Sequence, residues 1–203
     1  PDPARCEEII AAARAGALVG IVCNLVNDAQ GLAERLRGLA DTIPVDLFHA
    51  RFCFADRMAR EEEVIARYGK MAPRGQGRIL VATQVIEQSL DLDFDWLITQ
   101  LCPVDLLFQR LGRLHRHPRT RPTGFESARC TVLMPPATGE TMPDYGLHGV
   151  VYDYLRVLWR TQGLVEGHAV VDFPAAYREW IETVYGEQPT PEEPAAVTRT
   201  AER

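Results

Sequence analysis

Residues 78–101 read RILVATQVIEQSLDLDFDWLITQL and contain two apolar runs, 78–82 and 96–101, that are each typical of a buried strand. Outward from this stretch, similar apolar runs predict three further strands, at 17–23, 45–48 and 129–134. Amphipathic segments between the runs predict helices at 27–40, 56–70 and 103–113. Strands that alternate with helices in this way predict an α/β fold with a mostly parallel sheet flanked by helices.

The loops beyond the carboxyl ends of the strands are where function gathers in such sheets. Asn24, residues 49–51 and Thr83 each follow a predicted strand directly, so we expect them along one edge of the sheet. Asn27 is expected to cap the helix 27–40, with Gln30 as its capping-box partner.

The sequence changes character after Met134. Residues 135–145 are rich in proline and glycine, amphipathic patterns predict helices at 146–162 and 175–185, and residues 187–203 contain few apolar side chains. We therefore predict a main α/β domain over 1–134, a connector and short helical extension over 135–186, and a disordered tail over 187–203.

The composition excludes several classes of protein. Of 203 residues, 46% are hydrophobic and 25% are charged, as in ordinary globular domains. No apolar run approaches the roughly 18 residues of a membrane span and no signal peptide opens the chain, so we expect no membrane partner and a cytoplasmic location. The net charge of −6 argues against a uniformly basic nucleic-acid binder but allows a local basic patch. The five cysteines form no zinc-type pair, and no metal site is expected.

A phosphate loop of the form G-x-x-x-x-G-K-[ST] is missing from the sequence, and so is an acidic Walker-B segment after a strand. By itself the chain therefore cannot cradle a nucleoside triphosphate and hold its magnesium.

Residues 109–116, QRLGRLHR, carry the strongest chemical signal. If they continue the preceding helix, Leu107, Leu111 and Leu114 fall on one side. Gln109, Arg113 and Arg116 then fall on the opposite side. The polar side then presents an amide and two guanidinium groups, which suit a dispersed phosphate charge. Arg110 points elsewhere on this helix and is expected to matter less. The alternative is a solvated arginine face on a surface helix.

The turn after residues 78–82 is a second candidate site. A short helix capped by Thr83 would expose backbone N–H groups to a phosphate, and the Asp91 carboxylate could accept hydrogen bonds from ribose hydroxyls. The alternative is an ordinary cap followed by solvated aspartates. A calcium loop starting at Asp91 is rejected, because Trp96 and Cys102 occupy its sixth and twelfth positions.

Three further polar residues, Asn24, Arg51 and Arg57, could contact a sugar–phosphate backbone, although capping and solvation would explain them equally well. His49 is more typical of a structural histidine than of a catalytic one. His115 and His117 flank Arg116 without a third metal ligand, so we do not assign them a metal.

The order and spacing of these motifs resemble the second RecA-like motor domain of superfamily 2 helicases. IVCNLVNDAQ (21–30) resembles motif IV, FHARFCFADRMAREEE (48–63) the segment after it, ILVATQVIEQSLDLD (79–93) motif V and QRLGRLHRH (109–117) motif VI. The stretches 81–99 and 101–117 together are especially similar to the helicase–nuclease of type I CRISPR systems, the Cas3 family. YGLHGVVYDYLRVLWRT (145–161) is similar to the stretch after its motor core.

This resemblance implies roles in ATP hydrolysis. Arg113 and Arg116 would be arginine fingers that reach the γ-phosphate of ATP, and Gln109 would position that network. Asp91 would contact the ribose of the nucleotide. ATP and its magnesium would be held mainly by the first RecA-like domain of the same protein.

The resemblance also implies a single-stranded DNA translocase that carries an HD-type nuclease and is recruited by the Cascade surveillance complex to degrade invading DNA. Asn24, Arg51 and Arg57 would contact DNA phosphates. Thr83 would contact the DNA backbone and couple it to the ATP cleft, and Glu87 would brace the same turn.

Several features depart from the family pattern. Gln100 stands where an aspartate is expected, and motifs I to III and the HD nuclease are absent. The chain is therefore expected to be a fragment, a truncated product or one subunit of a split protein, with no ATPase or nuclease activity in isolation. The alternatives are another superfamily 2 motor, such as an RNA helicase or restriction translocase, or a non-catalytic α/β docking module.

Overall fold

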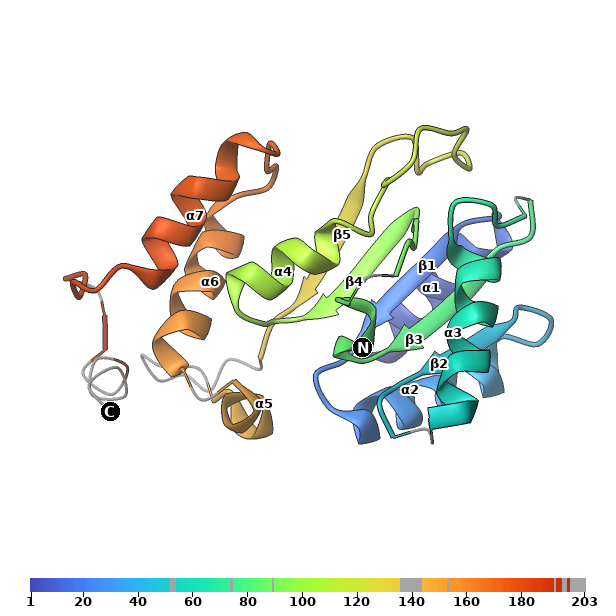
Figure 1. The fold of residues 1–203 in the computed structure, drawn as a ribbon, viewed down its shortest axis with the longest axis horizontal. Helices are drawn as coiled ribbons and strands as arrows, with labels where there is room; N and C mark the ends of the chain where they lie inside the picture. The colour runs from blue at the N-terminus through green and yellow to red at the C-terminus, as the bar shows by residue number, and fades with distance from the viewer. Residues whose placement is uncertain are drawn as a thin grey trace. The chain divides into compact units, whose positions relative to one another are not determined.

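Two compact units make up the chain. The computed structural model describes residues 1–51, 54–73, 75–88, 90–135, 144–152, 154–191, 193–194 and 197, and at 54–57, 148 and 150 only the backbone (Figure 1). The first unit, the sheet unit, comprises Pro1–Gln100 and Gln109–Leu133. The second, the helical unit, comprises Leu101–Phe108 and Met134–Arg203.

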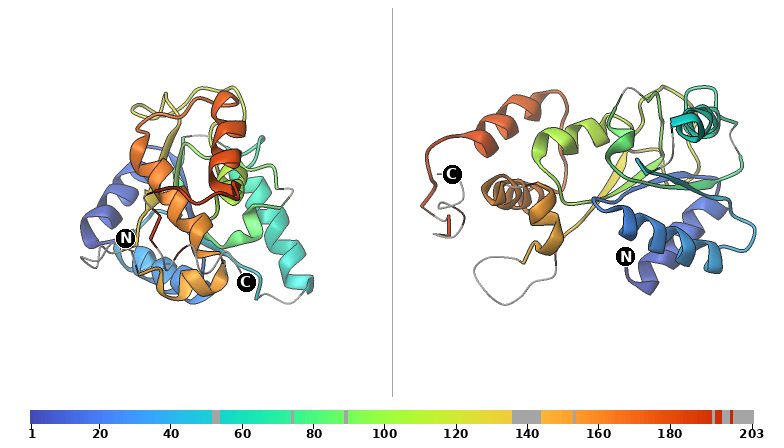
Figure 2. Two further views of the ribbon diagram at one scale, coloured as in Figure 1. Left: turned by 90° about the vertical axis from the view of Figure 1, so that its left-hand side faces the viewer. Right: turned by 60° about the horizontal axis from the view of Figure 1, so that its bottom comes forward.

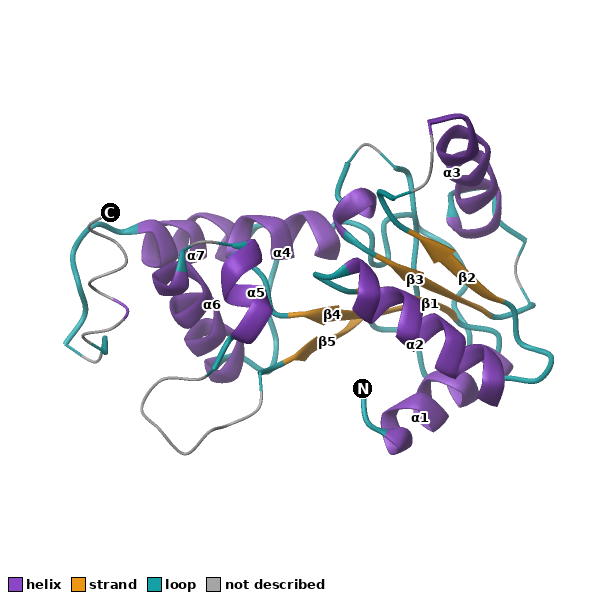
Figure 3. Cartoon of the chain, turned by 90° about the horizontal axis from the view of Figure 1, so that it is seen from below, coloured by secondary structure: helices purple, strands orange, loops and turns teal. Residues whose placement is uncertain are grey.

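Parallel strands in the order β2-β3-β1-β4-β5 form the sheet. Their bounds are β1 Leu18–Val22, β2 Val45–Phe48, β3 Arg78–Ala82, β4 Trp96–Gln100 and β5 Arg129–Leu133. Every residue of the central strand β1 is buried, as expected for a parallel sheet that is covered on both faces (Figure 3). The predicted α/β fold is confirmed, and each predicted strand lies within one residue of the observed bounds.

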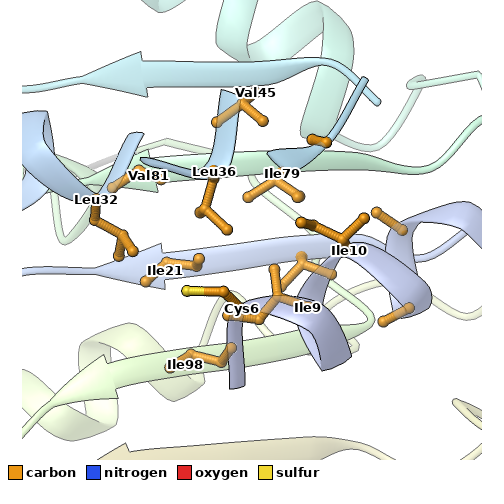
Figure 4. Close-up of a cluster of buried hydrophobic side chains, with 14 of the residues drawn as sticks. Cys6, Ile9, Ile10, Ile21, Leu32, Leu36, Val45, Ile79, Val81 and Ile98 are labelled. Carbon is orange, nitrogen blue, oxygen red and sulfur yellow. The ribbon is translucent and has the colours of Figure 1, made fainter. Parts of the chain in front are cut away.

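Helices α1 (Pro3–Arg14) and α2 (Val26–Leu39) cover one face of the sheet (Figure 3). Their apolar side chains pack against the inner strands, as Figure 4 shows for Cys6, Ile9, Ile10, Leu32 and Leu36 above Ile21, Ile79, Val81 and Ile98. Helix α1 was not among the predicted helices, and much of its buried stripe is alanine.

The predicted cap of the second helix is wrong. Helix α2 begins at Val26, one residue before the expected capping residue, and Leu25 at the N-cap makes no side-chain hydrogen bond. Asn27 therefore lies inside the first turn of the helix, where its Oδ1 accepts a hydrogen bond from Arg51 Nη1 at 3.1 Å.

The opposite face of the sheet is covered by α3 (Phe54–Tyr68) and by the chain after β3, which includes the short 3-10 helix η1 (Gln84–Ile86). Tyr68 is fully buried, with its hydroxyl 2.8 Å from the Ile79 carbonyl and 2.8 Å from Asp46 Oδ2. Burial, followed by the charge of Asp46, raises the pKa of Tyr68 well above its usual value. This tyrosine therefore joins α3 to β2 and β3 as a neutral hydrogen-bonding group.

Helix α4 (Val104–Leu111) ends earlier than the sequence predicts. Leu114 forms a parallel β-bridge with Phe94, and His115 adopts a φ of 47°, so the chain cannot continue as a helix to Arg116. The helical arrangement assumed for Gln109, Arg113 and Arg116 is therefore wrong.

Three helices follow in the helical unit: α5 (Gly146–Val151), α6 (Leu155–Gly167) and α7 (Ala175–Tyr185). The single helix predicted over 146–162 is thus two helices. Helices α6 and α7 lie side by side (Figures 1 and 2), and the buried Arg160 of α6 donates to backbone carbonyls at the end of α7, those of Thr183, Val184 and Gly186. These bonds satisfy carbonyls that a helix end otherwise leaves without partners.

The predicted disordered tail is described in part. The Glu193 side chain is fully buried and pairs with Arg156 and Arg160. Residues 192, 195–196 and 198–203 of that prediction lie outside the described residues.

Candidate functional site

The carboxyl edge of the sheet brings together the polar residues that the sequence placed there. Asn24 follows β1, Arg51 lies beyond β2 and Thr83 follows β3, and these three strands are neighbours. Gln84 Nε2 donates to the Asn24 carbonyl at 2.8 Å, and the Asn24 N–H donates to Gln100 Oε1 at 2.6 Å. The ends of β1, β3 and β4 are therefore joined by direct hydrogen bonds.

Arg110 lies at the centre of this edge and is fully buried. Its Nε donates to Glu87 Oε1 at 2.8 Å, its Nη2 to Asn24 Oδ1 at 3.1 Å, and its Nη1 to Thr99 Oγ1 at 2.6 Å and to the Gln100 carbonyl at 3.1 Å. One guanidinium thus links the end of α4 to the segments that follow β1 and β3 and to the end of β4. A buried charge is stable only when it is paired and hydrogen-bonded in this way.

Gln100, where an aspartate was expected, has a structural role here. Its Oε1 accepts from the Asn24 backbone, while its Nε2 donates to Asp28 Oδ2 at 3.1 Å in the first turn of α2. An amide can accept and donate at once, whereas an ionised aspartate can only accept. Glutamine at position 100, in place of the expected aspartate, is therefore able to donate a hydrogen bond to Asp28.

Arg51, His49 and Asn27 form a second group, beyond β2. The exposed Arg51 donates through Nη1 to Asn27, and its backbone N–H donates to His49 Nδ1 at 3.2 Å. His49 is buried, and this burial, reinforced by nearby arginine charge, lowers its pKa. These contacts support a structural role for His49. The side chain of Arg51, in contrast, is accessible to solvent. The side chain of Arg57 lies outside the described residues.

Arg113 is held against the 3-10 helix η1. Its Nε donates to the Ile86 carbonyl at 3.2 Å and its Nη2 donates to the Glu87 carbonyl at 3.1 Å, and only 9% of the residue is exposed. Burial, followed by the charge of Arg116, lowers the pKa of Arg113 from its very high usual value. The Glu87 backbone contacts Arg113 while its carboxylate contacts Arg110, so one residue joins both arginines.

Arg116 and Asp91 pair at the surface of the same unit. Arg116 Nε lies 2.8 Å from Asp91 Oδ1, and His117 Nε2 also lies 2.8 Å from that oxygen. The side chains of Arg116 and Asp91 are 40% and 44% exposed, so a ligand can reach both. Slight burial tends to raise the pKa of Asp91, but the hydrogen bond and charge of His117, together with Arg116, bring it below its usual value.

The remaining predicted residues have mixed outcomes. Gln109 lies near the end of α4 and is exposed, whereas Arg113 is buried. Thr83 is only 1% exposed and makes no side-chain capping bond, and η1 has three residues. The side-chain cap expected from Thr83 is therefore not formed.

Two features were missed from the sequence. One is the buried Arg110, which was expected to matter less because the assumed helix pointed it away from Gln109, Arg113 and Arg116. The other is a cluster around Asp93 and Asp95, which are fully buried and paired with Arg119 and Arg121, in contrast to the alternative in which the aspartates after this turn are solvated. The excess of arginine over aspartate after residue 101 was a signal for such pairing with acids elsewhere in the chain.

Among the described residues, no helix is long and apolar enough to cross a membrane. In the same part of the chain, no three His, Cys, Asp or Glu side chains gather in a way that could hold a metal ion.

Comparison with known proteins reveals a consistent set of relatives. Residues 15–119 match the family described as CRISPR-associated nuclease/helicase Cas3, C-terminal. The chain is 54% identical over 189 residues to the CRISPR-associated endonuclease/helicase Cas3 of Escherichia coli K12, a match that covers 91% of this chain and 21% of that protein. The chain therefore spans about a fifth of the length of this relative.

Solved structures agree with the sequence relatives. The crystal structure of T. fusca Cas3-ADP is similar with a TM-score of 0.82 and 31% identity, over 91% of this chain and 22% of that one. A chain in the CRISPR RNA-guided surveillance complex in its pre-nicking state is similar with a TM-score of 0.76 and 31% identity, over 90% of this chain and 22% of that one. The AMPPNP and ATP forms of T. fusca Cas3 are similar as well.

Proposed function

Since the chain belongs to the family described as CRISPR-associated nuclease/helicase Cas3, C-terminal, we propose that it is the second motor domain of an ATP-dependent single-stranded DNA translocase. In this proposal the chain contributes arginines to an ATP cleft that it shares with the first RecA-like domain of the complete protein. The observation that carries the proposal is the linkage of Arg113 to Asn24 through Glu87 and Arg110, because it would connect the proposed nucleotide side to the proposed DNA side.

The nucleotide side would be formed by Arg113, Arg116 and Asp91. The exposed Arg116–Asp91 pair fits a nucleotide, because the Arg116 guanidinium can bind a phosphate and the Asp91 carboxylate can accept a hydrogen bond from a ribose hydroxyl. Arg113 is pre-oriented by the Ile86 and Glu87 carbonyls, which lowers the ordering cost of a phosphate contact. Gln109, exposed nearby in sequence, would contact the same network.

Bound ATP would supply the phosphoryl group, and its magnesium would be held mainly by the first motor domain. The part of this chain is to place fixed positive charge where negative charge spreads over the transferring oxygens, an effect worth about 10³–10⁵ in rate for an arginine finger. The similarity of this chain to T. fusca Cas3-ADP supports a nucleotide as the ligand.

The DNA side would lie along the carboxyl edge of the sheet. Arg51 is exposed and free to reorient from Asn27 toward a phosphate, and Arg57 opens α3 close by in sequence. Asn24 and Thr83 are buried, and their backbone N–H groups already donate to Gln100 Oε1 and to the Phe48 carbonyl, so a DNA contact at these positions would require a local rearrangement.

Coupling between the two sides would run through buried polar contacts. Glu87 binds Arg113 through its carbonyl and Arg110 through its carboxylate, and Arg110 binds Asn24. A shift of Arg113 toward a nucleotide would therefore be transmitted to Asn24 without passing through solvent. Such networks transmit movement because every buried member must stay paired.

The partners in this proposal are the first RecA-like domain, an HD-type nuclease, single-stranded DNA and the Cascade surveillance complex. The similarity to a chain in the CRISPR RNA-guided surveillance complex supports the last of these.

The experiment is DNA-stimulated ATP hydrolysis by the complete protein with Arg113→Ala or Arg116→Ala. An arginine finger acts mainly in the transition state, so each change should lower kcat by about 10³-fold or more with little change in nucleotide affinity. Arg14→Ala is the matched control, because Arg14 is an exposed arginine in the last turn of α1. Unchanged ATP hydrolysis in both variants would instead favour a non-catalytic docking module.

A further inference from the structure

The segment Asp93-Phe94-Asp95 has its three side chains fully buried in two different environments. Phe94 packs against β1 so closely that a Cβ atom at Gly20 would lie 2.7 Å from its ring. Asp93 and Asp95 instead share one guanidinium: Arg121 Nη2 lies 2.9 Å from Asp93 Oδ1, and Arg121 Nη1 lies 2.9 Å from Asp95 Oδ1. Arg121 therefore bridges two buried carboxylates with its two terminal nitrogens.

A second arginine balances the remaining charge of this cluster. Arg119 Nε lies 2.7 Å from Asp93 Oδ2, and its Nη2 donates to the Lys70 carbonyl at 2.6 Å. The side chains of Arg121 and Arg119 are only 5% and 14% exposed. Two acids and two arginines are thus paired out of water, where the loss of any one leaves an uncompensated buried charge.

One end of the cluster is anchored in the core of the sheet. The Leu18 N–H donates to Asp95 Oδ2 at 2.7 Å, and the Asp95 N–H donates to the Leu18 carbonyl at 2.8 Å. Leu18 opens the central strand β1 and is fully buried. The acids are therefore fixed to the buried central strand of the sheet.

The other end holds the segment 113–117. The Phe94 N–H donates to the Arg113 carbonyl at 2.8 Å, and the His115 N–H donates to the Phe94 carbonyl at 3.1 Å. Arg121 Nη2 donates to the His117 carbonyl at 2.7 Å. Arg113 and Arg116 thus lie in a segment that is attached at both ends to the Asp93–Asp95 cluster.

We propose that Arg121, with Asp93 and Asp95, positions the arginine-finger segment 113–117 and thereby sets the rate of ATP hydrolysis. The inference rests on the proposed function, because it needs Arg113 and Arg116 to act on the nucleotide. The guanidinium groups of Arg119 and Arg121 are committed to buried acids, so we assign neither of them a phosphate contact. A displacement of about 1 Å at a reacting group can lower a rate about 100-fold, so a loosened segment should affect kcat first.

The test is Arg121→Lys in the complete protein. Lysine keeps the charge, but its compact ammonium cannot reproduce the planar bridge between two carboxylates. The kcat of DNA-stimulated ATP hydrolysis should fall about 10-fold to 100-fold, while the KM for ATP and the affinity for single-stranded DNA stay within about 2-fold. Arg14→Lys, at an exposed arginine of the same unit, should change none of these values.

A thermal melt keeps a purely structural role distinguishable. If Arg121→Lys lowers the melting temperature but retains normal kcat well below that temperature, the cluster only stabilises the fold and the proposal is overturned. Weaker DNA binding with unchanged kcat also overturns it, because Arg121 would then be a DNA ligand. If Arg121→Lys does not fold, Arg119→Lys decides by the same assays, because Arg119 contacts one acid and is more exposed.

The two proposals fail in different ways. Full activity of Arg113→Ala and Arg116→Ala would contradict the proposed function itself. Loss of activity in those variants with normal kcat in a folded Arg121→Lys protein would contradict the positioning role alone.

Discussion

Arg110 and Arg113 stand three residues apart and use their guanidinium groups differently. Arg110 is fully buried and donates to the side chains of Glu87, Thr99 and Asn24, whereas Arg113 is anchored on two backbone carbonyls. The first arrangement suits a group that holds elements together, and in the proposed function the second holds a guanidinium in place for a phosphate. The helical arrangement that made Arg110 less important than Arg113 and Arg116 is not present, and Arg110 instead has a structural role.

Arg110→Ala should destabilise the chain strongly. It leaves the Glu87 carboxylate and three other polar groups without this partner, and breaking a buried ion pair costs about 3–5 kcal/mol. Urea unfolding followed by circular dichroism measures the loss. The control Arg14→Ala should stay within about 0.5 kcal/mol of the parent chain. A loss below about 1 kcal/mol for Arg110→Ala would show that the hydrogen-bonded cluster contributes little.

Asp91 should titrate below the usual aspartate range, because His117 and Arg116 stabilise its ionised form. A depressed pKa in the folded state contributes stability above the unfolded-state value of about 3.9, and this contribution is lost as the pH falls through the folded value. NMR titration of the carboxyl carbon measures the pKa directly. His117→Ala should raise it toward the usual value, and a pKa that does not move would contradict the pairing.

The elements of the sheet unit were largely predictable, because buried strands and amphipathic helices leave local patterns in the sequence. All the strand positions followed from apolar runs, and residues at their carboxyl ends do meet. The end of α4 at Leu111 was not predictable in this way, because it depends on the bridge between Phe94 and Leu114. The burial of Asp93 likewise depends on Arg121, which lies 28 residues away.

Gln100→Glu tests how β4 is attached to α2. The change keeps the size of the side chain but replaces the donor to Asp28 with a second acceptor, so two carboxylates face each other. We expect a loss of about 1–3 kcal/mol in unfolding free energy at neutral pH. Adding Asp28→Asn restores an amide–carboxylate pair and should recover most of that loss in a double-mutant cycle. Additive effects of the two changes would contradict the contact.

On the scale of the whole molecule, the chain is acidic, with a net charge of −6, and many of its arginines are already paired. In the proposed function, nucleic-acid binding would therefore come from a few side chains at one edge of the sheet. The chain also spans 21% of the E. coli relative and lacks a phosphate loop, so we expect no measurable ATP hydrolysis by the isolated chain.

Single-stranded DNA should bind the isolated chain weakly and with a shallow dependence on salt. Each phosphate contact contributes about −0.7 to the slope of log affinity against log salt, so two or three contacts give a slope near −1.4 to −2.1. Fluorescence anisotropy at several salt concentrations measures it. Arg51→Ala with Arg57→Ala should weaken binding and flatten the slope, whereas Arg14→Ala should not. Binding that is unchanged by the double substitution would place the DNA on another surface.

The most direct measurement of the central claim, that this chain completes an ATP cleft with its arginines, is the affinity of the complete protein for ADP with aluminium fluoride. This complex imitates the transferring phosphoryl group, so an arginine finger should bind it more strongly than ADP alone. We predict that Arg113→Lys weakens binding of ADP–aluminium fluoride at least about 100-fold and leaves ADP affinity within about 2-fold, because lysine lacks the planar fork. Equal affinities of the parent and the variant for ADP–aluminium fluoride would contradict the account.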